Sequence, residues 1–202
     1  MEIVLATRNK KKVEEIKRIT EGMAVRIFTL DDFPGCPEVE EDGDTFEENA
    51  VKKAVTVAQF TGKAALADDS GLEVHALNGA PGTRSARYSG SEADDSKNTE
   101  KLLSEMRLFA KNDRKARFVC SMALAMPDGN VRTFNGHSEG SIGTEPKGAN
   151  GFGYDPVFYP EGSDRTFAEM SAEEKDSLSH RGNAIRKLQR YLRGTSPDSR
   201  MT

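Results

Sequence analysis

The stretch Ala64-Ala65-Leu66-Ala67-Asp68-Asp69-Ser70-Gly71 places two adjacent carboxylates at the end of a short apolar run. Successive side chains of an extended chain point to opposite faces, so at least one of the two aspartates must face the interior or a cleft. A carboxylate there needs a cation or hydrogen bonds, and Mg²⁺ is a hard cation that prefers oxygen ligands. The stretch therefore indicates either a magnesium site where a strand ends or an ordinary polar turn.

The composition is that of a globular protein. The chain has 202 residues, of which 36% are hydrophobic and 31% charged, so we expect one domain or one domain with two lobes. No apolar stretch is long enough to cross a bilayer, and the start lacks the pattern of a signal peptide. Cys36 and Cys120 suggest neither a disulfide framework nor a zinc motif, which favours a reduced, cytoplasmic setting.

The formal net charge of −4 argues against a general surface for duplex nucleic acid, which needs an excess of basic residues. The same charge is compatible with a small polyanion as ligand, because local cations can still collect in one cleft. We therefore expect no stable nucleic-acid binding and no membrane association.

The segment after the expected buried strand at Ile3–Ala6 carries a concentration of cations. Asn9 suits the N-cap of a following helix. Cations near the positive end of a helix dipole are unfavourable unless an anion compensates them. We therefore expect a phosphate-binding turn at residues 7–12, with a solvated charge run as the alternative. Its cations are Arg8, Lys10, Lys11 and Lys12.

An acidic run covers residues 38–44 and ends at Thr45, which forms a capping-box pattern with Glu48. We expect a helix to begin there. The acidic run is either a solvated loop or a second source of metal ligands, and the residues alone do not decide between these interpretations.

Two segments further along predict scaffold. Residues 118–126 alternate between large and small side chains, which is typical of a strand and makes Cys120 a core residue. A hairpin turn at 127–130 and a partner strand over 131–137 follow. Residues 94–110 predict a helix that packs through one apolar face and has no part in the chemistry.

The segment Pro146–Pro156 combines glycines with two aromatic residues. Glycine lets the backbone approach a ligand closely, and aromatic faces stack on nucleobases. The alternative is a loop whose aromatic side chains belong to the core.

The last two helices begin at polar caps. Ser171 and Glu174 form a capping box before a short helix that holds Lys175. Ser179 suits an N-cap that leaves His180 and Arg181 in the first turn of the final helix, where cations oppose the dipole. We expect these two residues to face an anion or a base edge. The expected domain covers residues 1–193, and residues 194–202 form a tail.

Five separated stretches occur in an order that resembles the inosine triphosphate pyrophosphatase (Ham1-like) family, whose bacterial members act on dITP and XTP. The resemblance extends from Ile3 to about Leu192. The stretches are Thr7–Lys12, Glu40–Asn49, Ala67–Gly71, Gly151–Pro156 and Ser179–Arg181.

The resemblance implies an α/β fold with a long, mixed, twisted sheet flanked by helices, and two lobes with a nucleotide cleft between them. It implies a homodimer that uses Mg²⁺ to hydrolyse XTP, ITP and dITP to the nucleoside monophosphate and pyrophosphate. Such a reaction would remove purine nucleotides with non-standard bases from the nucleotide pool.

The resemblance also implies roles for individual residues. Glu40 and Asp69 match metal ligands, and Asp69 also matches the general base. Because a carboxylate bound directly to Mg²⁺ is a poor base, one of these two roles stays open to Asp68 or Glu41. Three further positions match residues that support catalysis: Glu41, Lys53 and Asp68. Substrate contacts are expected at Thr7, Arg8, Asn9, Lys10, Lys11, Lys12, Ser70, Phe152, Gly153, Tyr154, Asp155, Lys175, His180 and Arg181.

Base selection requires a donor for the 6-oxo group of hypoxanthine or xanthine, which the 6-amino group of adenine would not satisfy. We expect Arg181, or a backbone N–H near His180, to supply that donor.

Three alternatives stay open at this point. A related Maf-like pyrophosphatase would act on modified pyrimidine or standard nucleotides. A regulator would bind nucleotides without turnover, although it would not need the carboxylates of Glu40, Asp68 and Asp69 together. A nucleic-acid-binding protein would use the cations of residues 8–12, against the negative net charge.

Overall fold

The computed structural model describes residues 1–90, 92 and 94–194. Of the expected tail, therefore, all but Gly194 lies outside the described residues. The described chain separates into two compact units. Unit 1 contains Met1–Asp69, Cys120–Gly136 and the residues from Arg181 onward, and unit 2 contains Ser70–Val119 and His137–His180.

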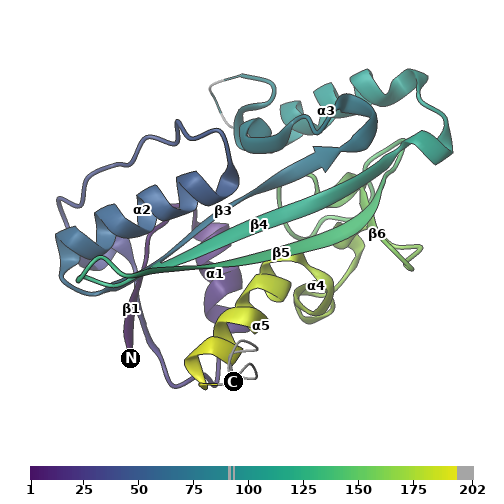
Figure 1. The fold of residues 1–202 in the computed structure, drawn as a ribbon. Coiled ribbons are helices and arrows are strands. Elements are labelled where there is room, and N and C mark those ends of the chain that lie inside the picture. Colours follow the sequence, from purple (N-terminus) through teal and green to yellow (C-terminus); the bar gives the residue numbers. More distant parts are fainter. Residues whose placement is uncertain (91, 93, 195–202) are drawn as a thin grey trace, which may run out of the picture. The chain divides into compact units, whose positions relative to one another are not determined.

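Six strands are paired in the order β2-β1-β3-β4-β5-β6 within the described chain (Figure 1). Strand β1 runs parallel to both β2 and β3, with Val4 opposite Phe28 and Ala65, whereas β5 and β6 are antiparallel. This mixed sheet with flanking helices confirms the expected α/β class. The strands are β1 (Glu2–Leu5), β2 (Arg26–Phe28), β3 (Ala64–Val74), β4 (Lys115–Ala125), β5 (Val131–Ile142) and β6 (Phe158–Pro160).

Helices cover both faces of the strands in unit 1 (Figure 1). Helices α1 (Lys10–Ile19) and α5 (His180–Leu192) pack on one face, where Ile16 and Leu188 meet Leu66 of β3. Helix α2 (Phe46–Thr61) packs on the other face, where its alanines meet Ala65 and Ala67. Alternate residues of β3 therefore serve opposite cores, as the period of two for a strand requires.

Unit 2 has its own core. It contains helices α3 (Asp95–Glu105) and α4 (Ala172–Leu178). Leu102 of α3 packs with Leu72 of β3 and with the aromatic rings of Phe158 and Phe167. No helix of the described residues combines the length and apolar character that a membrane span requires.

Strand β3 corrects one expectation. Asp68 and Asp69 do not end a strand or form a turn, because β3 continues without interruption from Ala64 to Val74. Aspartate and glycine are poor strand formers, but the strand is paired within the sheet and both carboxylates have partners, so tertiary context overrides local propensity. Both aspartates are also buried, at 1% and 7% exposure.

Three of the expected helix caps are formed. Asn9 accepts a hydrogen bond from the Lys12 N–H, and the capping boxes beginning at Thr45 and Ser171 are both formed.

The lengths of one helix and one strand differ from those expected. Helix α3 ends at Glu105 and not near residue 110, because a 3₁₀ turn follows at Met106–Leu108. Strand β5 continues to Ile142, five residues beyond the expected end, since its far end pairs with β6.

Candidate active site

Asp68 is enclosed by cations in unit 1. The guanidinium of Arg181 donates from Nε to Asp68 Oδ2 at 3.1 Å, and the ammonium of Lys12 lies 2.5 Å from Oδ1. The thiol of Cys120 donates to Oδ2 at 3.0 Å. Burial alone would raise the pKa of Asp68, but Arg181 and Lys12 hold that pKa well below its ordinary value. Asp68, whose side chain is 0% exposed, is therefore held in its charged form by its two cationic partners.

Arg181 has a second carboxylate partner. Its Nη1 donates to Glu15 of α1, and both side chains are buried. Burial would lower the pKa of Arg181, but Asp68 and Glu15 raise it. Removing one partner from such a buried ion network leaves an uncompensated charge, which costs about 3–5 kcal/mol. The network thus ties the middle of α1 and the start of α5 to the middle of β3.

Asp69 has different surroundings within unit 1. Asn49 donates from Nδ2 to Asp69 Oδ2 at 3.1 Å, and Lys53 Nζ lies 3.3 Å from Oδ1. Burial raises the pKa of Asp69 against the attraction of Lys53, and the neighbouring carboxylates of Glu41 and Asp68 raise it further. Asp69 is therefore a carboxylate for which the charged form is costly, with 10% of its side chain exposed.

Helix α2 places the partners of Asp69. Asn49 and Lys53 are four residues apart and so lie on one face of the helix. Lys53 Nζ also lies 2.5 Å from Glu41 Oε1 and donates to the Asp68 carbonyl at 2.9 Å. Burial would lower the pKa of Lys53, but Asp69 and Glu41 raise it. Lys53 therefore joins β3 to the acidic loop before α2.

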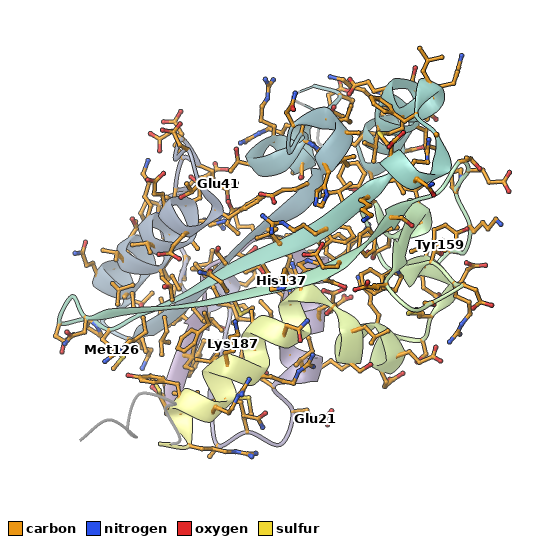
Figure 2. The ribbon with its side chains drawn as sticks, turned by 45° about the vertical axis from the view of Figure 1, so that its right-hand side comes forward. Glu21, Glu41, Met126, His137, Tyr159 and Lys187 are labelled. Carbon is orange, nitrogen blue, oxygen red and sulfur yellow. The ribbon has the colours of Figure 1, made fainter. Side chains whose placement is uncertain are left out.

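The acidic loop is fixed at Gly43. The Gly43 N–H donates to Asn49 Oδ1 at 2.8 Å, and a Cβ at this position would meet the same oxygen at 2.8 Å. Only glycine lets the backbone approach so closely. Glu41 precedes this anchor on the loop (Figure 2), and Glu40 beside it is exposed.

The turn before α1 has the geometry expected for an anion site. Asn9 caps the helix, and its own N–H donates to Thr7 Oγ1 at 3.2 Å. Lys12 points to Asp68, whereas Arg8 donates to the carbonyl of Cys36 at 2.9 Å. The exposed residues of the turn are Arg8, Asn9, Lys10 and Lys11.

The segment from Gly151 to Pro156 forms a braced loop in unit 2. Asp155 is buried and accepts from the Phe152 N–H at 2.8 Å and from Lys175 Nζ at 2.6 Å through the same oxygen, Oδ2. The ammonium of Lys175 lies 4.9 Å from the centroid of the Phe152 ring. Gly151 has φ 73°, and a Cβ there would collide with the Asp155 carboxylate.

Three other expected substrate contacts of unit 2 differ in exposure. Tyr154 is 4% exposed, and its hydroxyl donates to the Ser85 carbonyl at 2.8 Å, so its side chain belongs to the core. His180 is 4% exposed, and its ring stacks on Phe118 with centroids 4.7 Å apart. Ser70 of β3 is half-buried.

A divalent cation would find oxygen ligands beside Asp69. Among the residues that the structure describes, no preformed group of three or more His, Cys, Asp or Glu side chains could hold a metal ion. The carboxylates of Asp69 and Glu41 nevertheless both contact the ammonium of Lys53. The charge of Glu41 raises the pKa of Asp69. Mg²⁺ takes one or two carboxylates together with water and substrate phosphates, so this donor set fits it.

The structure therefore brings six of the expected residues together in unit 1. They are Lys12, Glu41, Lys53, Asp68, Asp69 and Arg181. Sequence reasoning missed Asn49 and Glu15. Asn49 sits one residue after Glu48 of the capping box and resembles any polar helix residue, and Glu15 looks like a solvated charge on α1. Only a three-dimensional placement reveals what each one touches.

The chain is similar to known proteins over almost its whole length. The Ham1 family model matches residues 3–191. A curated dITP/XTP pyrophosphatase of Desulforamulus reducens is 50% identical over 192 residues, covering 95% of this chain and 96% of the relative. One of Bacillus subtilis is 45% identical, covering 95% and 96%. The structure of the Staphylococcus aureus Ham1 protein superposes with a TM-score of 0.86 at 43% identity, covering 97% of this chain and all of that one. The chain belongs to the Ham1 family.

Proposed function

We propose that this protein is a nucleoside triphosphate pyrophosphatase that hydrolyses dITP, XTP and ITP to the monophosphate and pyrophosphate. Two curated relatives that cover almost the whole chain carry the name dITP/XTP pyrophosphatase. The observation that supports this most is the buried Asp69 carboxylate, which lies beside Lys53 and Glu41 and has a raised pKa. That combination of carboxylates and a fixed cation suits attack of water on a phosphorus atom.

Mg²⁺ is the proposed cofactor, with Asp69 and Glu40 as its ligands and Glu41 beside them. When bound, it neutralises charge on phosphate oxygens and lowers the pKa of a coordinated water. Asn49 fixes the orientation of Asp69 through the hydrogen bond to Oδ2. Lys53 Nζ donates to the other carboxylate oxygen of Asp69, Oδ1, and also contacts Glu41, so it holds the two carboxylates near each other.

Asp69 is the residue to which we assign acceptance of the proton from water. Without metal the pKa of Asp69 is raised, its side chain retains 10% exposure, and Glu41 contacts the same ammonium as the alternative base where Mg²⁺ occupies Asp69. Asp68 is unsuited to this role, because its side chain is 0% exposed and its pKa is lowered by Arg181 and Lys12. We therefore assign Asp68 the task of holding Arg181 and Lys12 in place.

The phosphates would be held by fixed positive charge in unit 1. Lys12 and Lys53 are both ordered by carboxylates, and the capped start of α1 directs the positive end of its dipole outward. Thr7, Asn9, Lys10 and Lys11 belong to the same turn. Attack at the α-phosphorus would release pyrophosphate in one step.

The base would be recognised by the loop of unit 2, where Phe152 offers a half-buried ring and Lys175 a buried ammonium. Arg181 is a weaker candidate for the base-reading donor than its sequence position suggests, because Asp68 and Glu15 occupy its guanidinium. A backbone N–H near His180 is the remaining candidate for the donor to the 6-oxo group of the base.

We further propose that the enzyme is a cytoplasmic homodimer and that it has no affinity for nucleic acid.

A substrate panel tests this function. Pyrophosphate release would be measured from dITP, XTP, dATP, dGTP and dUTP, each with Mg²⁺ and with a chelator. We expect rapid release from dITP and XTP only, and only with the metal. Preferential activity on dUTP or standard nucleotides would support a Maf-like pyrophosphatase. Tight binding of ITP without turnover would indicate a nucleotide-binding regulator.

A further inference from the structure

Helix α3 holds the loop of unit 2 at a single residue, Gly153. The N–H of Gly153 donates to Asp95 Oδ2 at 3.0 Å, and the hydroxyl of Thr99 donates to the Gly153 carbonyl at 3.4 Å. Asp95 and Thr99 are four residues apart, so they lie on one face of α3. Thr99 is 6% exposed. Both polar groups of Gly153 are thus satisfied by side chains of one helix.

The loop needs such a restraint. Gly151 and Gly153 both have positive φ, at 73° and 62°, and glycine is the residue with the largest number of accessible conformations. Asp155 braces the loop on one side through the Phe152 N–H. Asp95 and Thr99 brace it on the other, so that the residue between Gly151 and Gly153 is held from both directions.

The α3 contacts surround the one partly exposed aromatic residue of the loop. Phe152 lies between the two glycines, and the centroid of its ring is 4.9 Å from Lys175 Nζ. Phe152 is half-buried, whereas Tyr154 is buried. Burial raises the pKa of Tyr154, and the phenol of Tyr88 and the carboxylate of Asp95 raise it further. The Asp95 carboxylate therefore bonds the Gly153 N–H and lies near enough to act on the neighbouring Tyr154 phenol.

We propose that Asp95 and Thr99 are positioning residues that fix the Gly151–Pro156 loop and thereby set the affinity and the selectivity for the base. This rests on the proposed function, in which Phe152 and its neighbours contact the base. Both residues contact the loop through the backbone of Gly153. Their loss should consequently weaken binding and blur the choice between bases while leaving the chemical step intact.

The chain offers a matched control in the adjacent aspartate. Asp94 caps α3 by accepting from the N–H groups of Ser96 and Lys97 at 2.9 and 3.0 Å. Asp94→Ala removes a helix cap from the same helix and leaves the Asp95 carboxylate and the Gly153 hydrogen bond in place. Any effect of Asp95→Ala that comes merely from a weaker α3 should therefore appear in Asp94→Ala as well.

The test compares steady-state kinetics on dITP and dATP, together with thermal unfolding, for wild type and four variants. We expect Asp95→Ala to raise KM for dITP about tenfold, to change kcat by less than about twofold, and to lower the dITP-to-dATP ratio of kcat/KM. Asp95→Asn, whose amide oxygen can still accept, should restore most of the affinity. Thr99→Val should show a smaller rise in KM, and Asp94→Ala should lower the melting temperature with KM unchanged.

Equal KM and equal base selectivity in Asp95→Ala and Asp94→Ala would overturn the proposal, as would a loss confined to kcat. If Asp95→Ala fails to fold, the near-isosteric Thr99→Val decides. Unchanged KM and unchanged selectivity in folded Thr99→Val would equally overturn the proposal. Failure of the proposed function is distinguishable, because wild type itself would then show no preference for dITP.

Discussion

Asp68 and Asp69 are neighbours on β3, yet their carboxylates contact separate sets of partners. Asp68 is held by Arg181 and Lys12, and Asp69 lies between Asn49 and Lys53. The pKa of Asp68 is lowered and that of Asp69 is raised. The alternation of a strand thus gives two identical side chains different tasks, one in the scaffold and one in the proposed chemistry.

Asp68→Asn should destabilise the protein. The substitution leaves Arg181 and Lys12 with one carboxylate fewer in a buried site, so we expect a loss of about 3–5 kcal/mol in the free energy of unfolding. Urea unfolding followed by circular dichroism measures it. A change below about 1 kcal/mol, the range of surface ion pairs, would show that the network does not hold the fold together.

Lys53 and Lys52 form a matched pair of adjacent lysines on α2. Lys53 is 8% exposed and contacts Glu41 and Asp69, whereas Lys52 is exposed and pairs with Asp42. We expect Lys53→Met to lower kcat by about 10²-fold or more, because a fixed cation beside the reacting phosphate is lost. Lys52→Met should leave kcat within about twofold. Equal kinetics in the two variants would remove Lys53 from the proposed machinery.

Arg181→Ala tests whether this residue reads the base. The guanidinium contacts Asp68 and Glu15, so its loss should destabilise the protein and reduce turnover of ITP and ATP by the same factor. The measurement is the ratio of kcat/KM for the two substrates. A selective loss of ITP turnover, with ATP unaffected, would restore the base-reading role and contradict the purely structural one.

The pH dependence of stability follows from the same network. A carboxylate whose pKa is lowered on folding stabilises the folded state above its unfolded pKa, and this stabilisation is lost as the pH falls. The free energy of unfolding should therefore decrease as the pH falls below about 4. Asp69 acts in the opposite sense, since a raised pKa favours folding at acidic pH.

Denaturant unfolding from pH 3 to pH 7 separates the two carboxylates. Asp68→Asn should flatten the acid dependence relative to wild type, because the group that loses stability on protonation is gone. Asp69→Asn should steepen it. Identical slopes for wild type and Asp68→Asn would mean that other carboxylates govern acid unfolding.

Local signals predicted much of the fold. The N-cap at Asn9 and the capping boxes at Thr45 and Ser171 are sequence patterns with a direct backbone consequence, and all three form. The large–small alternation around Cys120 likewise identified a strand and a buried thiol. Burial raises the pKa of that thiol, in agreement with an unreactive core residue.

Long-range partners could not be predicted in this way. The polar residues of β3 suggested a turn, because the carboxylate partners that make a continuous strand possible come from α1, α2 and α5. Glu15 is separated from Arg181 by 166 positions, and no local pattern marks that pair. Asp95 and Thr99 indicated no more than part of an expected helix for the same reason, since their contact with Gly153 exists only in the folded chain.

The most direct measurement of the central claim is pyrophosphate release from dITP by wild type, Asp69→Asn and the control Asp31→Asn, each with Mg²⁺ and with a chelator. Asp31 is an exposed aspartate of the same unit. We predict that Asp69→Asn lowers kcat by about 10³-fold while it remains folded, that Asp31→Asn matches wild type, and that chelation abolishes release. Turnover by a folded Asp69→Asn within about tenfold of wild type would contradict the assignment of Asp69 as the centre of the reaction.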